Sequence, residues 1–392
     1  MNILFVTARF PYPPLRGDQV IPYHRLKLLS KRHSITLITF YQHDNELVYL
    51  KELSHFCADI ITVKLCKISS ILNLLKGFFS KLPFQVLYFH SKEFKKQLQI
   101  LLLKRNFNII HTFTLRMAEY TKNINIPKVI DLIDSMQLNI ERRLLVDNFF
   151  LKILLREELK RLREYENGIA NIYDSSVVVS ERDRNYVSSK KVLTIPLGVD
   201  VDFFKRHSNL PFNITIIFSG NMGYFPNENA VLWFVDNCFI KIKGKIPNVK
   251  LLIVGNNPTA KVKNLHNGDS VIVTSYVDSM VDILNKAQVA IAPMQAGSGM
   301  QFKILEAMAC ELPVVTTKIG IGGISSLADR ENIVIADSAT DFSNACIELL
   351  CNYQLAVKIG KAAREIVVEK YGWELNVSEI EKCYNNILRK PD

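Results

Sequence analysis

Short runs of consecutive apolar, often β-branched residues alternate with segments of helical periodicity along the whole chain. Such runs predict strands buried on both faces of a parallel sheet, because a strand with one solvated face carries polar residues at every second position. In the first half the predicted strands are 3–7, 34–40, 60–64, 109–112, 128–132, 176–180 and 193–195. In the second half they are 215–219, 250–254, 271–274, 289–292, 314–316 and 332–336. Two series of this kind predict an α/β protein with two doubly wound sheets.

The predicted boundary between the two series is a polar, proline-containing segment at 205–213, after the turn at Gly198-Val199-Asp200. We therefore predict an N-terminal domain at 1–205 and a C-terminal domain at 206–375. A length of 392 residues suits two domains better than one core. A last helical pattern, from Asn376 to Arg389, predicts a closing helix within 376–392 that packs back on the N-terminal domain.

Composition narrows the class of protein. Hydrophobic residues make up 48% of the chain and charged residues 22%, which is typical of a globular domain in water. The first residues lack the basic flank and long apolar run of a signal peptide, and no run of about 18 apolar residues predicts a membrane span. The seven cysteines show neither CxxC pairs nor zinc-ligand spacing, which favours free thiols in a reducing cytoplasm.

The net charge of +11 is unevenly distributed, because residues 64–105 hold nine Lys or Arg and Glu93 as the sole acidic residue. Leucine and phenylalanine lie between these cations, a pattern typical of a segment that lies in an anionic membrane surface. The alternative is a pair of ordinary amphipathic helices with solvated lysines. No nucleic-acid reading motif accompanies the charge, so we expect no nucleic-acid partner. A second basic helix, predicted at 142–163, either extends this surface or packs on the core.

Residues 297–315 combine a glycine loop, a helix that carries Lys303 and Glu306 near its start, and a proline-led apolar strand. Backbone N–H groups at a helix N-terminus attract anions, and glycine lets a phosphate approach them. Lys303 can add a positive charge for a diphosphate. Glu306, three positions further, faces the same way and can accept hydrogen bonds from a ribose. The stretch therefore predicts a nucleotide site, with an ordinary turn before a helix as the alternative.

Several motifs together carry a family resemblance over essentially the whole chain. They are Arg9-Phe10-Pro11-Tyr12-Pro13-Pro14 with Gly17, Ile110-His111-Thr112, Val179-Ser180-Glu181, Ile195-Pro196-Leu197-Gly198-Val199-Asp200, Phe218-Ser219-Gly220-Asn221, and Leu305-Glu306-Ala307-Met308-Ala309-Cys310 through Pro313-Val314-Val315. In this order the chain resembles the retaining, nucleotide-sugar-dependent glycosyltransferases of group 1. Asn221-Met222, Pro226-Asn227 and Trp233-Phe234 are similar to a sub-branch associated with exopolysaccharide assembly.

The resemblance implies a GT-B fold, in which two Rossmann-like domains face a central cleft, and a hexosyltransferase that acts with retention. The donor would be a nucleoside-diphosphate sugar and the acceptor a glycan or lipid-linked glycan. No metal or other cofactor is expected. The protein would act in the cytoplasm, peripheral on the inner membrane face, in surface polysaccharide synthesis. Its oligomeric state stays open.

The implied site residues fall into three groups. His111 and Lys303 would be catalytic. Asp18 and Arg116 would contact the acceptor. The donor would be bound by Gly17, Gly220, Asn221, Tyr276, Ser298, Gly299, Met300, Gln301, Phe302, Lys303 and Glu306.

This sequence departs from the family pattern at two places. Asn221 and Pro226-Asn227 stand where the family usually has an Arg and a Lys for the diphosphate. Ser298 stands where the family often has the first of two glutamates, the one that contacts the transferred sugar. Either backbone amides of Gly299, Met300 and Gln301 take over, or activity is reduced or lost.

Three alternatives follow from these departures and from the doubly wound pattern. A binding or assembly protein with little turnover is one, and a sugar-nucleotide epimerase of the same fold is another. A dinucleotide oxidoreductase would need a G-x-G-x-x-G turn after the first strand, which residues 7–11 do not supply.

Overall fold

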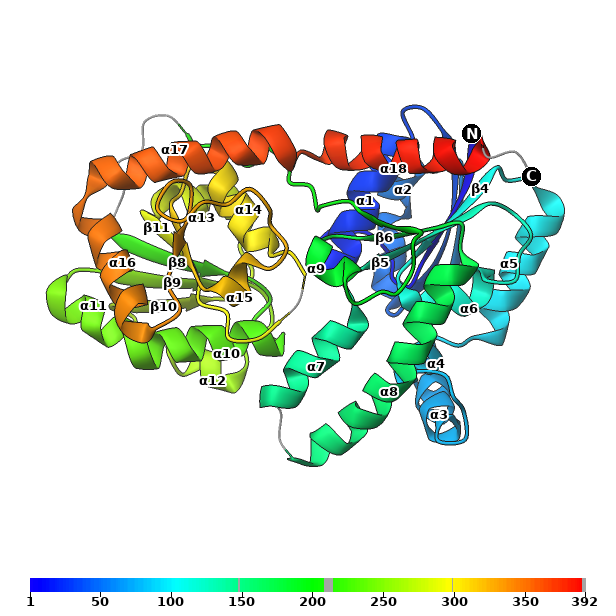
Figure 1. The fold of residues 1–392 in the computed structure, drawn as a ribbon, viewed down its shortest axis with the longest axis horizontal. Coiled ribbons are helices and arrows are strands. Elements are labelled where there is room, and N and C mark those ends of the chain that lie inside the picture. Colours follow the sequence, from blue (N-terminus) through cyan, green and yellow to red (C-terminus); the bar gives the residue numbers. More distant parts are fainter. Residues whose placement is uncertain (147–148, 208–213, 298, 390–392) are drawn as a thin grey trace. The chain divides into compact units, whose positions relative to one another are not determined.

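In the computed structural model, which describes residues 1–146, 149–207, 214–297 and 299–389, the chain divides into two compact units (Figure 1). Unit 1 contains Met1–Pro196 and the C-terminal segment from Trp373, and unit 2 contains Leu197–Gly372. The divisions lie before the predicted ends at 205 and 375. Residues 197–199 belong with unit 2 because the Leu197 N–H donates to Met300 Sδ at 3.3 Å and the Val199 N–H donates to the Tyr371 carbonyl at 2.7 Å. Most of the predicted linker at 205–213 lies outside the described residues.

Unit 1 is built on a parallel sheet of seven strands in the order β3-β2-β1-β4-β5-β6-β7. The strands are β1 (Asn2–Thr7), β2 (Ser34–Tyr41), β3 (Asp59–Lys64), β4 (Ile109–Phe113), β5 (Lys128–Ile133), β6 (Ser175–Val178) and β7 (Val192–Thr194). Each matches a predicted strand within two residues at either end. The strand order reverses between β1 and β4, so the carboxyl ends of these two strands flank the crevice where doubly wound sheets bind ligands.

Helices connect the strands of unit 1 and cover its sheet (Figure 1). They are α1 (Gly17–Leu29), α2 (Leu50–Ser54), α3 (Lys67–Gly77), α4 (Phe84–Tyr88), α5 (Lys92–Lys104), α6 (Ala118–Thr121), α7 (Met136–Val146), α8 (Phe149–Ile172), α9 (Glu181–Arg184) and α18 (Trp373–Leu388), with short 3₁₀ helices η1 (Asp44–Tyr49) and η2 (Leu115–Met117). The single helix predicted at 142–163 is wrong, because α7 ends at Val146 and α8 begins at Phe149.

The last helix, α18, packs on α1 within unit 1. The Trp373 indole stacks on the His24 ring, with ring centroids 4.6 Å apart. The Asn376 side chain accepts a hydrogen bond from Arg25 Nε at 3.0 Å. The segment predicted as a closing helix from Asn376 thus begins three residues earlier and is held by contacts with the first helix of the chain.

Unit 2 holds a second parallel sheet, of six strands in the order β10-β9-β8-β11-β12-β13. The strands are β8 (Thr215–Ser219), β9 (Lys250–Val254), β10 (Val271–Thr274), β11 (Val289–Ala292), β12 (Val314–Thr316) and β13 (Val334–Ile335). All but β13 have the predicted bounds, and β13 is shorter than the predicted 332–336. The strand order reverses between β8 and β11.

The helices of unit 2 include one that follows β11 and opens the predicted nucleotide site. They are α10 (Phe225–Phe234), α11 (Ile240–Lys245), α12 (Ala260–Lys263), α13 (Met280–Lys286), α14 (Phe302–Ala309), α15 (Lys318–Ile321), α16 (Ala339–Cys351) and α17 (Tyr353–Lys370), with a π-helical turn η3 (Val235–Phe239). Among the described residues of the whole chain, no helix is long and apolar enough to cross a membrane.

Candidate functional site

The Lys303 amine lies at the carboxyl edge of the unit 2 sheet, where the strand order reverses. Its Nζ lies 4.3 Å from the centroid of the Phe218 ring on β8 and 3.9 Å from Met294 Sδ, just after β11. It donates to Asn227 Oδ1 at 2.5 Å. The first turn of α14 therefore delivers a cation to the place where ligands of doubly wound sheets bind.

Gly220, directly after β8, leaves the space into which this amine projects. A Cβ built at Gly220 would meet Asn227 Nδ2 at 2.9 Å and Lys303 Nζ at 3.2 Å, and the residue has φ +150°. The Asn227 amide donates to the Asn221 carbonyl at 2.9 Å, and the Asn221 side chain accepts from the Gly223 N–H at 3.1 Å. Asn221 thus closes its own turn, while Asn227 positions the lysine.

No described side chain caps the N-terminus of α14, which follows a glycine-containing loop. Gln301 is the N-cap residue and its side chain makes no capping hydrogen bond, and the first N–H groups of any helix lack partners within it. Gly297 and Gly299 adopt φ +116° and +71°, a region that favours glycine. These features suit an anion at the start of α14.

Glu306 follows Lys303 by one turn on the same half-buried helix face. Its backbone carbonyl accepts from Cys310, and among the described residues no hydrogen bond or ion pair reaches its carboxylate. The carboxylate therefore keeps its full capacity to accept hydrogen bonds.

Burial shifts the pKa values of Lys303 and Glu306 in opposite directions. It lowers the pKa of Lys303 to about 7, with the Glu306 charge opposing the shift. It raises the pKa of Glu306 to about 7, with the Lys303 charge opposing it. An anion beside the amine would favour the protonated lysine, so the site is electrostatically incomplete without one.

The remaining predicted donor residues differ in what the structure places around them. The buried Met300 accepts the Leu197 N–H through its sulfur, which makes its side chain a packing element. Phe302 is the first residue of α14. Tyr276 follows the edge strand β10, two strands from β8, and 61% of its side chain is exposed, so the structure does not bring it to Lys303. Ser298 lies outside the described residues.

In unit 1, Gly17 and Asp18 form the start of α1, after the loop that follows β1. Gly17 is exposed, and Arg16 is the N-cap residue. Asp18 pairs with Arg9 Nε at 2.6 Å, and both side chains are about a quarter exposed, at 24% and 25%. The predicted contact of Asp18 with the acceptor would therefore involve a carboxylate that is already paired with a cation.

Arg116 follows β4 and lies on the same edge of that sheet. One of its nitrogens donates to Gln85 Oε1 at 3.1 Å, and the guanidinium lies 5.7 Å from the centroid of the Phe89 ring. Burial lowers its pKa, and the charge of Asp18 acts against this shift. Thr114, two residues before it, has φ +75°, a strained value of the kind that gathers at functional sites.

The family resemblance implies a catalytic role for His111. Its side chain is fully buried inside unit 1. Its ring stacks on Phe5 with centroids 4.4 Å apart, and Nδ1 shares a hydrogen bond with Tyr384 Oη at 2.7 Å. Nε2 lies 4.0 Å from the Asp131 carboxylate, which pairs with the buried Arg25. Burial and the charge of Arg25 hold the pKa of His111 well below its ordinary value, so the ring is neutral. Its position supports a structural role.

Sequence reasoning missed Asn227 and Phe218 as parts of the lysine site. Asn227 was interpreted as the loss of a family lysine, whereas it is the hydrogen-bond partner of Lys303. The signal available in the sequence was its place at the start of a proline-led helix after Gly220, where a buried amide would need a partner.

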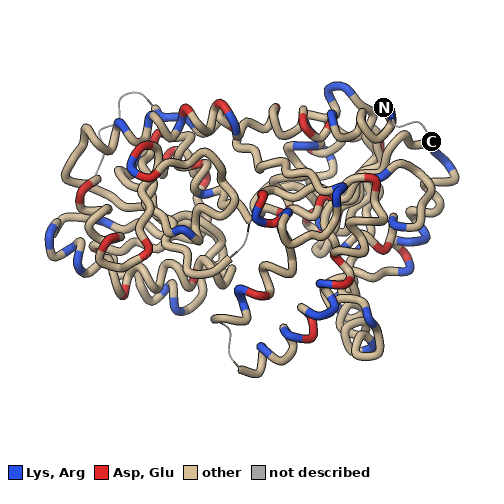
Figure 2. The backbone as a smooth tube through the Cα atoms, viewed as in Figure 1, with Lys and Arg blue, Asp and Glu red and all other residues tan. Residues whose placement is uncertain are grey.

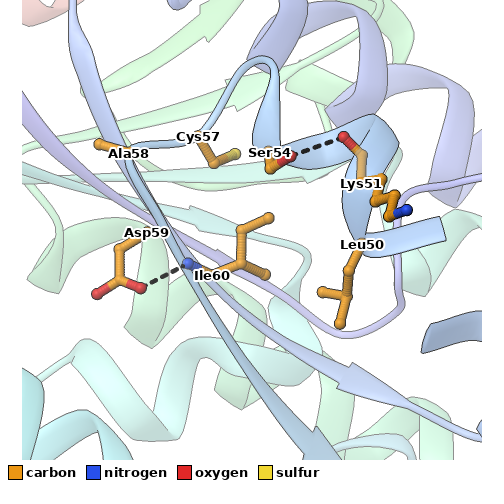
Figure 3. A pocket seen from close by; sticks show the side chains of 7 residues that line it. All are labelled: Leu50, Lys51, Ser54, Cys57, Ala58, Asp59 and Ile60. Carbon is orange, nitrogen blue, oxygen red and sulfur yellow. Dashed lines mark hydrogen bonds between the residues drawn. The ribbon is translucent and has the colours of Figure 1, made fainter. Parts of the chain in front are cut away.

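An open hollow in unit 1 lies beside α2 and the start of β3 (Figure 3). Two of its polar side chains are bonded within the chain: Ser54 Oγ donates to the Lys51 carbonyl at 2.7 Å, and the Asp59 carboxylate accepts the Ile60 N–H at 3.0 Å. Burial raises the pKa of Cys57 to about 12, so this thiol is neutral. The hollow is at the amino end of a strand, away from the edge where such sheets bind ligands, and nothing in it selects a ligand.

The chain is similar in sequence and in fold to known glycosyltransferases. Residues 213–352 match the family described as glycosyl transferases group 1. The chain is 22% identical over 405 aligned positions to an uncharacterised 44.6 kDa protein of the cps region of Klebsiella pneumoniae, covering 97% of this chain and 99% of the relative.

Solved glycosyltransferase structures share the whole fold. Sucrose-phosphate synthase from Thermosynechococcus elongatus superposes with a TM-score of 0.73 at 16% identity over 99% of each chain. HepE from Anabaena, solved with UDP and glucose, superposes with a TM-score of 0.70 at 15% identity over 98% of this chain and 100% of its own. Residues 213–352 therefore match the group 1 glycosyltransferases, and the chain as a whole has the GT-B fold.

Proposed function

We propose that this protein transfers a hexose, with retention of anomeric configuration, from a nucleoside-diphosphate sugar to a glycan or lipid-linked acceptor. The group 1 match supports sugar transfer, and the complex of the similar HepE with UDP and glucose supports a nucleotide-sugar donor. The similar protein of a cps region supports a place in surface polysaccharide synthesis. Free cysteines throughout the described residues fit a reducing cytoplasm.

The observation that carries this proposal is the Lys303 amine beside the open Glu306 carboxylate. The amine is held by Asn227 and Phe218 at the sheet edge, with its pKa lowered by burial. A donor diphosphate bound there pairs with the protonated Lys303 amine and accepts hydrogen bonds from the first N–H groups of α14. Its ribose hydroxyls donate to Glu306, which lies one turn further along the helix.

The chain's residues then act on the departing group. The bond between the sugar's anomeric carbon and the diphosphate oxygen breaks, while the acceptor hydroxyl oxygen forms the new bond on the same face. Negative charge grows on the diphosphate, where Lys303 and the first amides of α14 stabilise it. The acceptor proton passes to the departing phosphate, so no protein base is needed. We further propose that no metal takes part, and an unchanged rate in EDTA would support this.

The rival is a nucleotide-sugar-binding protein with little turnover, which the serine at position 298 favours. Serine can hydrogen-bond a sugar hydroxyl but cannot supply the negative charge of the family's glutamate. The rival and the transferase predict the same donor binding and differ only in turnover.

The experiment has two stages. A panel of UDP-, GDP-, ADP- and dTDP-sugars is first screened by thermal shift, since a bound ligand raises apparent stability. The selected donor is then incubated with lipid-linked acceptor extracts, and nucleotide release is measured. Release with an α-anomeric product from an α-linked donor, identified by NMR, supports retaining transfer. Binding without release supports the rival, and the absence of binding across the panel would contradict both.

A further inference from the structure

Helix α3 carries its apolar side chains on the outside of unit 1. Its buried residues are Ser70 and Gly77, while Phe79, just beyond its end, is 97% exposed and Ile68 is 71% exposed. We call the following exposed residues the α3 face: Ile68, Ile71, Leu72, Leu75, Phe78 and Phe79. A surface helix normally points such residues to the core, so this orientation is reversed.

Specific contacts fix the reversed orientation. A Cβ at Gly77 would meet Leu87 Cδ1 at 2.6 Å, so α3 approaches α4 closely through a small residue. From α8, the Glu158 carboxylate accepts the Phe84 N–H at 2.7 Å at the start of α4. Arg161 donates to the Gly77 carbonyl at 2.8 Å and to the Leu82 carbonyl at 3.2 Å. Buried charged groups of α8 therefore hold the α3–α4 hairpin with the α3 face in solvent.

A second apolar group lies where α7 ends and α8 begins. Leu145, Phe149, Phe150, Ile153 and Leu154 are all exposed, with Phe150 at 82%. Further along α8, Leu155, Leu159 and Leu162 pack in the core. In Figure 1, α3 and this end of α7 and α8 project from unit 1 on the same side of its sheet.

The charges around α3 have one sign. Residues 65–92 contain Lys67, Lys76, Lys81 and Lys92 and no acidic residue, and Figure 2 shows Lys and Arg without Asp or Glu along α3. At about 100° per residue, Lys67 and Lys76 fall on opposite borders of the α3 face. This is the arrangement of helices that lie in a membrane interface, with cations at the phosphates and apolar groups among the acyl chains.

We propose that the α3 face, together with the exposed apolar residues at the end of α7 and the start of α8, docks on an anionic lipid surface. The apolar residues of α5 belong mostly to the core of unit 1 and are not part of this docking surface. Phe94, Leu98 and Leu101 are buried there, while Leu103, next to the last residue of the helix, is 88% exposed.

The charge pattern favours lipid over a second copy of the chain. Self-association through the α3 face would bring the lysines of two copies together without acidic partners on this segment. An anionic bilayer instead attracts each lysine, because its phosphate groups carry the opposite charge. Docking rests on these residues alone and does not depend on the proposed transfer reaction.

The test is vesicle flotation of the full chain at low salt. The probes are vesicles of phosphatidylcholine alone and vesicles with an equal amount of phosphatidylglycerol. We expect binding to the anionic vesicles that weakens with added salt. The variant Leu75→Asp/Phe79→Asp should bind at least about tenfold more weakly, because two apolar side chains no longer enter the bilayer. Ile240→Asp, at a site 71% exposed in unit 2, is the matched control and should bind like the parent.

Three results would overturn the proposal. First, the parent chain fails to float with anionic vesicles. Second, the parent and the double variant float equally. Third, the parent sediments as a dimer while the double variant sediments as a monomer. The last would assign the face to a second copy. Thermal unfolding and the donor-induced thermal shift of the double variant should match the parent, which separates this test from that of the donor site.

Discussion

Two regions of the molecule place ionisable residues at the edge of a doubly wound sheet, yet they have different chemistry. In unit 1, Arg25 and Asp131 form a fully buried ion pair beside His111. In unit 2, Lys303 and Glu306 are half-buried and lie one helical turn apart. The first region takes its partners from the protein, with Asn376 and Tyr384 of α18 bonded to Arg25 and His111. The second leaves a carboxylate without a protein partner among the described residues.

This difference shows that burial alone does not mark a functional site. Burial lowers the pKa of Arg25 to about 10, which still leaves the group charged and paired near neutral pH. The pKa values of Lys303 and Glu306 both lie at about 7, where either charge can change when a ligand arrives. Unused bonding capacity together with a tuned pKa is the better indicator of a binding role.

The largest expected effect is on stability and tests the unit 1 pair. Arg25→Met leaves Asp131 buried without a cation and should cost about 3–5 kcal/mol of unfolding free energy, measured by urea denaturation. Arg32→Met is the matched control, because Arg32 is 61% exposed where it pairs with Glu381 and should cost about 1 kcal/mol or less. Equal losses of unfolding free energy in the two variants would mean that the buried ion pair contributes no more to stability than the exposed one.

The second prediction concerns transfer rate. Lys303→Ala should lower the rate of sugar transfer by about 10²- to 10³-fold, because the charge on the departing diphosphate loses its stabilising cation. Unfolding free energy should stay level or rise, since a desolvated charge is removed. Lys318→Ala, at a side chain 80% exposed in the same unit, should leave the rate unchanged. Full activity of the Lys303 variant would remove its role.

The third prediction isolates the open carboxylate. Glu306→Gln should weaken binding of the donor by about tenfold or more in calorimetry, because hydrogen bonds to a charged acceptor are stronger than those to an amide. Glu331→Gln, at an exposed position in unit 2, serves as the control. An affinity equal to that of the parent would rule out the ribose contact.

The fourth prediction is a pH dependence of donor binding, with a maximum near pH 7. Above this value the free site must take up a proton at Lys303, so affinity should fall by up to about tenfold per pH unit. Below it Glu306 is protonated and must lose its proton to accept both ribose hydroxyls, so affinity should fall again. A nucleotide sugar is the suitable ligand because its diphosphate does not titrate in this range. Lys303→Met should abolish the alkaline decline and Glu306→Gln the acid one; a flat profile in the parent would contradict both assignments.

The smallest expected effect tests whether His111 has a structural or a catalytic role. Tyr384→Phe removes the hydrogen bond to Nδ1 and should cost about 1 kcal/mol of unfolding free energy with the transfer rate unchanged. A rate that falls far more than stability would restore the catalytic role that the sequence suggested for His111.

Local pattern was sufficient for much of this molecule. The strands from 215–219 to 314–316 have the predicted bounds, because unbroken β-branched runs are stable only as buried parallel strands. The spacing of Lys303 and Glu306 places them on one helix face by helical geometry alone.

Tertiary structure decided what depends on contacts between distant residues. Asn227 meets Lys303 across 76 positions, and Tyr384 meets His111 across 273, so the sequence could name these residues without showing what they bond. The periodicity of α3 likewise predicts an amphipathic helix but not the side it faces. That side was settled by Gly77 against α4 and by Arg161 of α8, since packing over long sequence separations depends on the folded chain and leaves no local periodicity.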